Sequence, residues 1–554
     1  MTRYDRRTFV RLGGAAAVTA LAGCSGSGGD GAAGGHEEPS PTEGAPGGGE
    51  TGTDGASEQS YTWTDATWDS YWYSLFNMST NISMSGNGVL FPHTDEQRAA
   101  FEERFPAMLA AADQDRPPVK NPNLNVAPFT TGDPSFTREP VLSDESGRPD
   151  ASTLVWDESK SSGVVSPSSL AWTHLKGVTW AKNFENHVDL LPDGLAPEFR
   201  SQVLATLAQL GIRTALIDGG PDGTGALTNG EGMQLVSGFR PATGAVTDDA
   251  ARPTHHSAML WFLSDATSLA RGGWFGYENP EPLIPAERIQ GLADGLATTT
   301  MDLFAPADVV EAGSTRDLGQ MLGAVGWYGT HAGSDDLAAR AAAYAGDLAD
   351  AVAAHLDGNG KVADGADNRA ATQGAVAQGL AWASELDGVD RTGAAKEALG
   401  YLLDDLWDDD AGTFASGVDD ETYTITARDA GDVTGGINAA AAVLGMDVRE
   451  TYARYFDATF NRGRLQRAER PPSRNADAEH PLPLPPDAGG EYGQAAVYNA
   501  GVAYDTAADE WSVADRTFDT AGALYLANQD VWIGQWGGEF FQGRGVPGRS
   551  DTPS

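Results

Sequence analysis

The feature that most constrains this chain is a repeating pair of helices in its second half. After residue 197 the sequence consists of long Ala- and Leu-rich amphipathic stretches, separated by short turns that contain Gly and Asp. One stretch of each pair is rich in small residues and the next is more charged, with a period of about 50–60 residues. Because small residues permit close packing, the first helix is expected inside and the second outside. The sequence therefore predicts a mainly α fold built from repeated helical hairpins.

Two arrangements would bury such hairpins, a closed ring or an open solenoid. A closed ring is favoured because about six hairpins are available and no polar capping repeat is evident. The predicted helices cover residues 197–210, 255–271, 285–304, 315–330, 335–356, 367–385, 391–406, 430–444, 446–460, 490–507 and 514–529.

One turn adds a resemblance to a known group of folds. The segment from Trp407 to Phe414, with the sequence Trp-Asp-Asp-Asp-Ala-Gly-Thr-Phe, closes one predicted hairpin. Together with the alternating inner and outer helices, it resembles the (α/α) toroids of six-hairpin glycosidases, epimerases and related sugar-active proteins. The resemblance covers roughly residues 255–534. It implies an active cleft at the N-terminal ends of the inner helices, lined by carboxylates and aromatic side chains.

The residues at the corresponding positions define a candidate site for a glycan or another small molecule. Sugar hydrolysis needs two carboxyl groups, about 5–5.5 Å apart for retention or 6.5–9.5 Å for inversion. An aspartate at a helix start is also a favoured cap, so a non-catalytic ligand-binding or accessory role stays open. The acid/base candidates are Asp317, Asp429, Asp432 and Glu491, and the candidate stacking platforms are Trp274, Trp327 and Tyr328.

The N-terminus predicts an export signal and a lipid anchor. Arg6 and Arg7 precede a short, weakly apolar run, and Leu-Ala-Gly leads directly to Cys24. This order is typical of twin-arginine export followed by lipidation of the cysteine. The expected partners are therefore the export machinery and membrane lipid, and the expected location is the extracytoplasmic face of the cell membrane.

The segments after the anchor differ in composition. Residues 25–60 are almost entirely Gly, Ser, Pro, Glu and Thr, so they predict a disordered tether after the 1–24 signal. Residues 61–193 are expected to form an irregular, aromatic-rich region, and residues 194–554 the hairpin-repeat domain. Asn77 and Asn81 begin two glycosylation sequons, which are either modified or ordinary loop residues.

The charge and the cysteine count exclude several classes of protein. The formal net charge is −42 and the chain has one cysteine. A basic nucleic-acid surface and an intrachain disulfide are therefore excluded. No metal-ligand spacing and no cofactor motif is present, so neither a metal nor a cofactor is expected. The diffuse acidity resembles that of proteins from salt-loving archaea, because molar salt screens such self-repulsion.

Overall fold

The computed structural model describes most of the chain after the predicted tether. The described residues are 61–78, 95–121, 129–141, 145, 148, 150–186, 196–230, 232–272, 280–312, 314–364, 367–417, 420–467 and 494–536. Several predictions fall outside these ranges, namely the signal and tether with Arg6, Arg7 and Cys24, and the candidate residues Asn81, Trp274 and Glu491.

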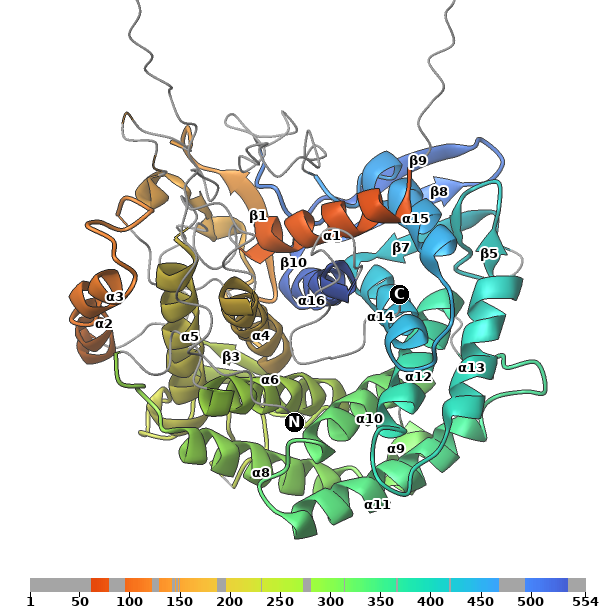
Figure 1. Ribbon diagram of the computed structural model, residues 1–554, viewed down its shortest axis with the longest axis horizontal. Helices are drawn as coiled ribbons and strands as arrows, with labels where there is room; N and C mark the ends of the chain where they lie inside the picture. Colours follow the sequence, from red (N-terminus) through yellow and green to blue (C-terminus); the bar gives the residue numbers. More distant parts are fainter. Residues whose placement is uncertain are drawn as a thin grey trace, which may run out of the picture.

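Six helices form a closed inner ring (Figure 1). Each packs against the next one in the chain, and the last packs against the first. The fold is therefore an (α/α) toroid and not an open solenoid, as the sequence favours. The inner helices are α4(Pro167–Asn186), α6(Pro253–Gly272), α10(Thr315–Gly329), α12(Arg369–Ala383), α14(Ala427–Ala442) and α16(Thr520–Trp536).

A second set of helices surrounds this ring. Three of them, α5, α13 and α15, end in a turn of π-helix, at Thr214–Asp218, Tyr401–Asp405 and Asp457–Arg462. The outer helices are α5(Pro197–Arg213), α8(Ala286–Leu303), α11(Asp335–Ala353), α13(Thr392–Gly400), α15(Arg449–Phe456) and α1(Trp63–Met78).

The ring begins earlier in the chain than the sequence predicts. Helices α1 and α4 both lie in the region expected to be irregular, residues 61–193. α1 packs along α16 and beside α15, which completes the outer layer where the ring closes. Its Trp68, Tyr71 and Trp72 are buried, so the helix lacks the polar face by which an outer helix is usually detected.

Small residues bring the inner helices into backbone contact, as predicted. A Cβ atom added to Gly319 of α10 would lie 2.6 Å from the carbonyl oxygen of Ala375 in α12. One added to Gly374 of α12 would lie 2.3 Å from the carbonyl oxygen of Asp432 in α14. Any larger residue at these positions would push the helices apart, so the glycines set the diameter of this half of the ring.

Short strands gather before the inner helices and along the loops. The predicted helix at 490–507 is not formed, because residues 501–505 instead make the central strand of a three-stranded sheet. The sheets are β1(Thr131–Phe136) with β2(Trp156–Asp157) and β10(Phe518–Asp519); β3(Gly238–Arg240) with β4(Ala245–Asp248); β5(Trp407–Asp408) with β6(Thr413–Phe414); and β7(Thr422–Thr426) with β8(Gly501–Asp505) and β9(Glu510–Asp515).

Three short helices complete the described fold: α2(Asp95–Glu102), α3(Phe105–Ala111) and α9(Pro306–Ala312). The sequon at Asn77 lies at the buried end of α1, where the side chain is 0% exposed. Its amide nitrogen donates to the carbonyl of Tyr73, and its amide oxygen accepts from the backbone of Tyr498. A glycan at Asn77 is therefore incompatible with this fold. Within the described ranges, no helix has the length and apolar character needed to cross a bilayer.

Candidate active site

The N-terminal ends of the inner helices lie together at one end of the ring, which we call the rim. Gly319 of α10 approaches Ala375 of α12, and further along Gly326 approaches Trp382, so the two helices run in the same direction. Strand β7 leads directly into α14, and strand β10 leads directly into α16. Asp317 and Asp429 are in the first turns of α10 and α14, and Asp432 follows in the second turn of α14. The structure therefore places these three predicted residues at the rim.

The three aspartates at the rim are held by two arginines, and we call these five residues the rim network. Nη2 of Arg316 lies 2.6 Å from Oδ2 of Asp432 and 2.7 Å from Oδ1 of Asp429. Nη2 of Arg428 lies 2.6 Å from Oδ1 of Asp317, and its Nε lies 3.9 Å from Asp432. One guanidinium thus bridges two carboxylates, and the other joins α14 to α10.

Burial divides the network into a deep layer and an accessible layer. Asp432 is 1% exposed, whereas the side chains of Arg428 and Asp317 are 38% and 34% exposed. Burial raises the pKa of Asp432, against the opposing charges of Arg316 and Arg428. Burial also disfavours the charge on Arg316, but Asp432 and Asp429 outweigh it and raise the pKa of the guanidinium. The deep layer is therefore a fixed ion pair, since arginine stays protonated.

Asp429 has a structural task that occupies both of its oxygens. Oδ2 accepts from the backbone nitrogen of Thr426 at 2.8 Å and from its hydroxyl at 2.7 Å, and the Asp429 nitrogen donates back to that hydroxyl. This reciprocal arrangement is a capping box at the start of α14. With Oδ1 against Arg316, both oxygens of Asp429 already have partners within the protein.

A histidine that the sequence did not single out as catalytic stands at the same rim. Nδ1 of His255, in the first turn of α6, lies 2.7 Å from the hydroxyl of Ser168 at the start of α4. Burial, helped by the charges of Arg252, His256 and Arg428 and opposed by Asp248, lowers the pKa of His255 to about 4. The imidazole is therefore uncharged at neutral pH. Only its place in the first turn of an inner helix, after the β3–β4 hairpin, could have pointed to it.

Two of the predicted stacking residues lie elsewhere. Trp327 and Tyr328 are near the C-terminal end of α10, and ten residues of helix separate Asp317 from Trp327, about 15 Å. Tyr328 is fully buried and its hydroxyl donates to Asp294 at 2.8 Å, so no ring face is available to a sugar. Trp327 packs on Trp261 and Trp382. Neither aromatic residue belongs to the rim.

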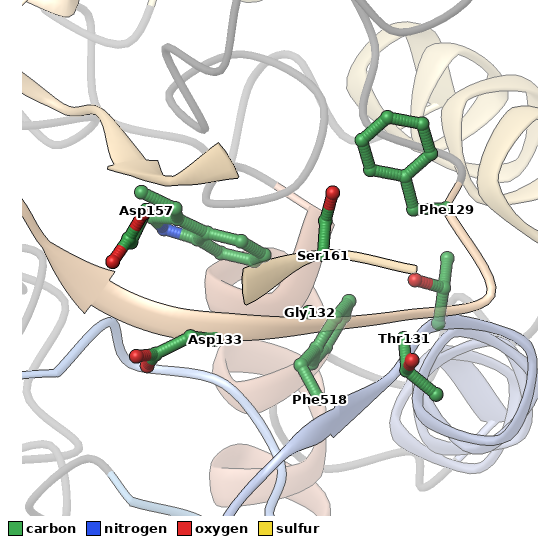
Figure 2. Close-up of a pocket in the computed structure, with 9 residues that line it drawn as sticks. Phe129, Thr131, Gly132, Asp133, Asp157, Ser161 and Phe518 are labelled. Carbon is green, nitrogen blue, oxygen red and sulfur yellow. The ribbon is translucent and has the colours of Figure 1, made fainter. Parts of the chain in front are cut away.

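A small pocket lies in the strand layer that leads into α16 (Figure 2). Its two carboxylates are neutralised by Lys160, whose Nζ is 2.7 Å from Asp133 and 3.7 Å from Asp157. Within the described ranges, no group of three or more His, Cys, Asp or Glu residues is arranged to hold a metal ion. The pocket is lined by Phe129, Thr131, Gly132, Asp133, Trp156, Asp157, Ser161, Phe518 and Thr520.

Comparisons with known proteins give structural matches only. No protein-family model and no curated protein matches the chain. A D-mannose isomerase is similar with a TM-score of 0.42 and 11% identity, over 80% of this chain and 99% of that one. A sugar epimerase from a ruminal bacterium gives 0.40 and 10%, over 68% and 89%. A xylose complex of a reducing-end-xylose releasing exo-oligoxylanase gives 0.33 and 9%, over 80% and 95%.

Proposed function

We propose that this chain processes a carbohydrate by proton transfer at the rim, with His255 as the group that accepts and returns the proton. The observation that carries the proposal is the imidazole of His255 at the start of α6, held by Ser168 at the same rim as the guanidinium of Arg428. Burial is the main reason that this imidazole is uncharged. A base needs a free lone pair at working pH, and an oxyanion formed by its action needs a positioned cation. His255 and Arg428 supply these two functions.

The chemistry that suits this pair is removal of a proton from a carbon next to a carbonyl group. His255 takes the proton, the electron pair moves toward the carbonyl oxygen, and Arg428 stabilises the resulting oxyanion. If the planar intermediate turns over beside His255, return of the proton to the opposite face of the same carbon gives an epimer. Return of the proton to the former carbonyl carbon, with the hydroxyl proton of the neighbouring carbon passing to the former carbonyl oxygen, gives an isomer. Ser168 orients the imidazole, while Asp317 and Asp432 position Arg428. Hydrolysis by two carboxylates is less favoured, because all three described candidates are paired with arginine.

Deuterium exchange tests this proposal directly. Unlabelled aldoses and ketoses incubated with the protein in D2O should gain deuterium at the carbon beside the carbonyl, which NMR detects. His255→Asn should reduce the exchange rate by about 10²–10⁴-fold, the usual contribution of a general base. His331→Asn is the matched control, because His331 is also half-buried but follows the opposite end of α10. Sugar cleavage without exchange, or exchange unaffected by His255→Asn, would overturn the proposal.

Ligand binding without turnover is the second candidate function. It is favoured by the ion pairs of Asp317, Asp429 and Asp432 with arginines, because a carboxylate held in an ion pair is a weak acid or base. Calorimetric titration with the same sugars separates the two functions. Binding with no deuterium exchange and no product supports this second function, whereas exchange that depends on His255 excludes it.

We also propose that the chain is exported by the twin-arginine machinery and held on the membrane through Cys24. The order of Arg6, Arg7, the short apolar run and Cys24 supports this proposal. In a host with that pathway, Cys24→Ala should move the exported protein from the membrane to the soluble fraction. Replacing Arg6 and Arg7 with Lys should keep it in the cytoplasm. Membrane retention of the Cys24→Ala protein would contradict the anchor.

Adaptation to high salt is a separate proposal, supported by the net charge of −42. Salt screens repulsion among surface carboxylates, so the melting temperature should fall as KCl is lowered from molar to millimolar concentration. A melting temperature that does not change across this range would contradict it.

A further inference from the structure

Arg428, the more accessible arginine of the rim, is already paired with the carboxylate of Asp317. This pairing bears on the charge that a substrate at the rim can carry. The rim network contains two guanidinium groups and three carboxylates, so it has no surplus positive charge. Next to it, Arg252 is paired with Asp248 at 2.9 Å, and His255 is uncharged. A ligand beside these groups therefore meets no unpaired cation. Arg369, the first residue of α12, instead donates to the backbone carbonyls of Val362 and Asp364.

We propose that Asp317 is a specificity-determining residue that restricts the rim to neutral sugars by occupying Arg428. This inference rests on the proposed function, since it names the substrate class of the same site. Arg428 is the more exposed guanidinium of the network, because the Arg316 side chain is only 15% exposed and lies against two aspartates. Asp317 contacts Nη2 of Arg428, the group that would otherwise bind a substrate carboxylate or phosphate.

The physical basis is a competition between like charges. A sugar acid or sugar phosphate would have to displace Asp317 from Arg428, and it would then lie beside a displaced carboxylate. Asp432, 3.9 Å from Nε of the same arginine, adds a second repulsive charge when it is ionised. A neutral sugar avoids this competition, because its hydroxyls can donate to Asp317 and its carbonyl oxygen can accept from the N–H groups of Arg428 that Asp317 does not contact. Those same N–H groups stabilise the charge that develops on this oxygen during proton transfer, so Asp317 need not be displaced.

Isothermal titration at fixed ionic strength tests this inference, with D-glucuronate and D-glucose as probes. Asp317→Asn should bind D-glucuronate about tenfold more tightly than the wild type, because a charge-assisted contact to Arg428 becomes available. The double variant Asp317→Asn, Arg428→Gln should lose that gain. Asp302→Asn is the matched control, since it breaks an exposed pair with Arg340 on the outer helices. Asp317→Ser repeats the test if the asparagine variant melts below the assay temperature.

Wild-type protein that binds D-glucuronate as tightly as D-glucose would overturn the inference. So would an Asp317 variant that is folded and gains no affinity, or a gain that survives loss of Arg428. These outcomes differ from failure of the proposed function, which is measured by deuterium exchange on neutral sugars. If exchange is absent but the glucuronate gain depends on Arg428, charge selection at the rim stands and the proton-transfer function fails.

Discussion

The two ends of the helical ring differ in chemistry, although the same helices form both. At the rim, α10 and α14 begin with arginines and aspartates that pair across the ring. At the other end, α10, α12 and α16 finish with Trp327, Trp382 and Trp532, and Trp261 of α6 packs against Trp327 and Trp532. We call these four residues the tryptophan end.

The comparison shows that position along a helix decides which residues can share a site. Aspartates are favoured in the first turn, where they cap free N–H groups and face the positive end of the helix dipole. Residues a few turns later lie far from that end, whatever their sequence neighbours suggest. Asp317 and Trp327 stand on one helix, so they cannot face one sugar ring from about 15 Å apart.

Removing the charge that organises the rim should have the largest effect on stability. Arg316→Met leaves Asp432 and Asp429 buried without their shared partner, and we expect a loss of about 3–5 kcal/mol in the free energy of unfolding. Urea unfolding followed by circular dichroism measures it. Adding Asp432→Leu to Arg316→Met should restore part of the loss, because one uncompensated charge is removed. A loss below about 1 kcal/mol would mean that solvent reaches the deep layer.

A comparable substitution at the tryptophan end should lower stability but leave substrate binding unchanged. Trp327→Ala removes ring contacts with Trp261 and Trp382, and we expect a loss of about 2–3 kcal/mol, since the indole is only partly buried. KM for any sugar that the protein turns over should stay within about twofold. A tenfold rise in KM would return Trp327 to the substrate site and break the distinction between the two ends.

Much of the ring could be predicted because its signals are local. The helices predicted at 315–330, 367–385 and 430–444 correspond to α10, α12 and α14, and each start has a polar cap, from Ser314, Asn368 and Thr426. The small residues of these helices also predict the close packing that the structure shows. Here periodicity, caps and packing all point to the same structure.

The features that the sequence did not predict correctly share one cause. Each depends on residues that are distant in the sequence. Ala495 and Ala496 look like the start of another small-residue helix, but the chain beyond them pairs with β7 and β9. The last inner helix instead starts after Asp519, whose carboxylate accepts from the backbone of Gly522 and Ala521. The charge state of His255 is set mainly by burial, which depends on the tertiary fold, so it cannot be read from the neighbouring residues Arg252 and His256 alone.

The smallest predicted effect is on the pH dependence of the free energy of unfolding. It is measured with one histidine variant from each end of the ring. Burial lowers the pKa of His255 to about 4 and also lowers the pKa of His331, to a less marked extent. Because the folded state resists protonation, each contributes stability that is complete above about pH 6.5 and is lost as the pH falls toward the folded pKa. Asp530 acts in the opposite direction, since burial raises its pKa to about 8 and its contribution is lost as the pH rises. The free energy of unfolding should therefore be measured at pH 7 and pH 4.5 for each variant and for the wild type.

The wild type should lose stability between pH 7 and pH 4.5. His255→Asn should reduce this loss by about 1–2 kcal/mol, and His331→Asn should reduce it by less. Equal effects of the two variants would mean that the charges of Arg252 and His256 beside His255 add nothing to the effect of burial.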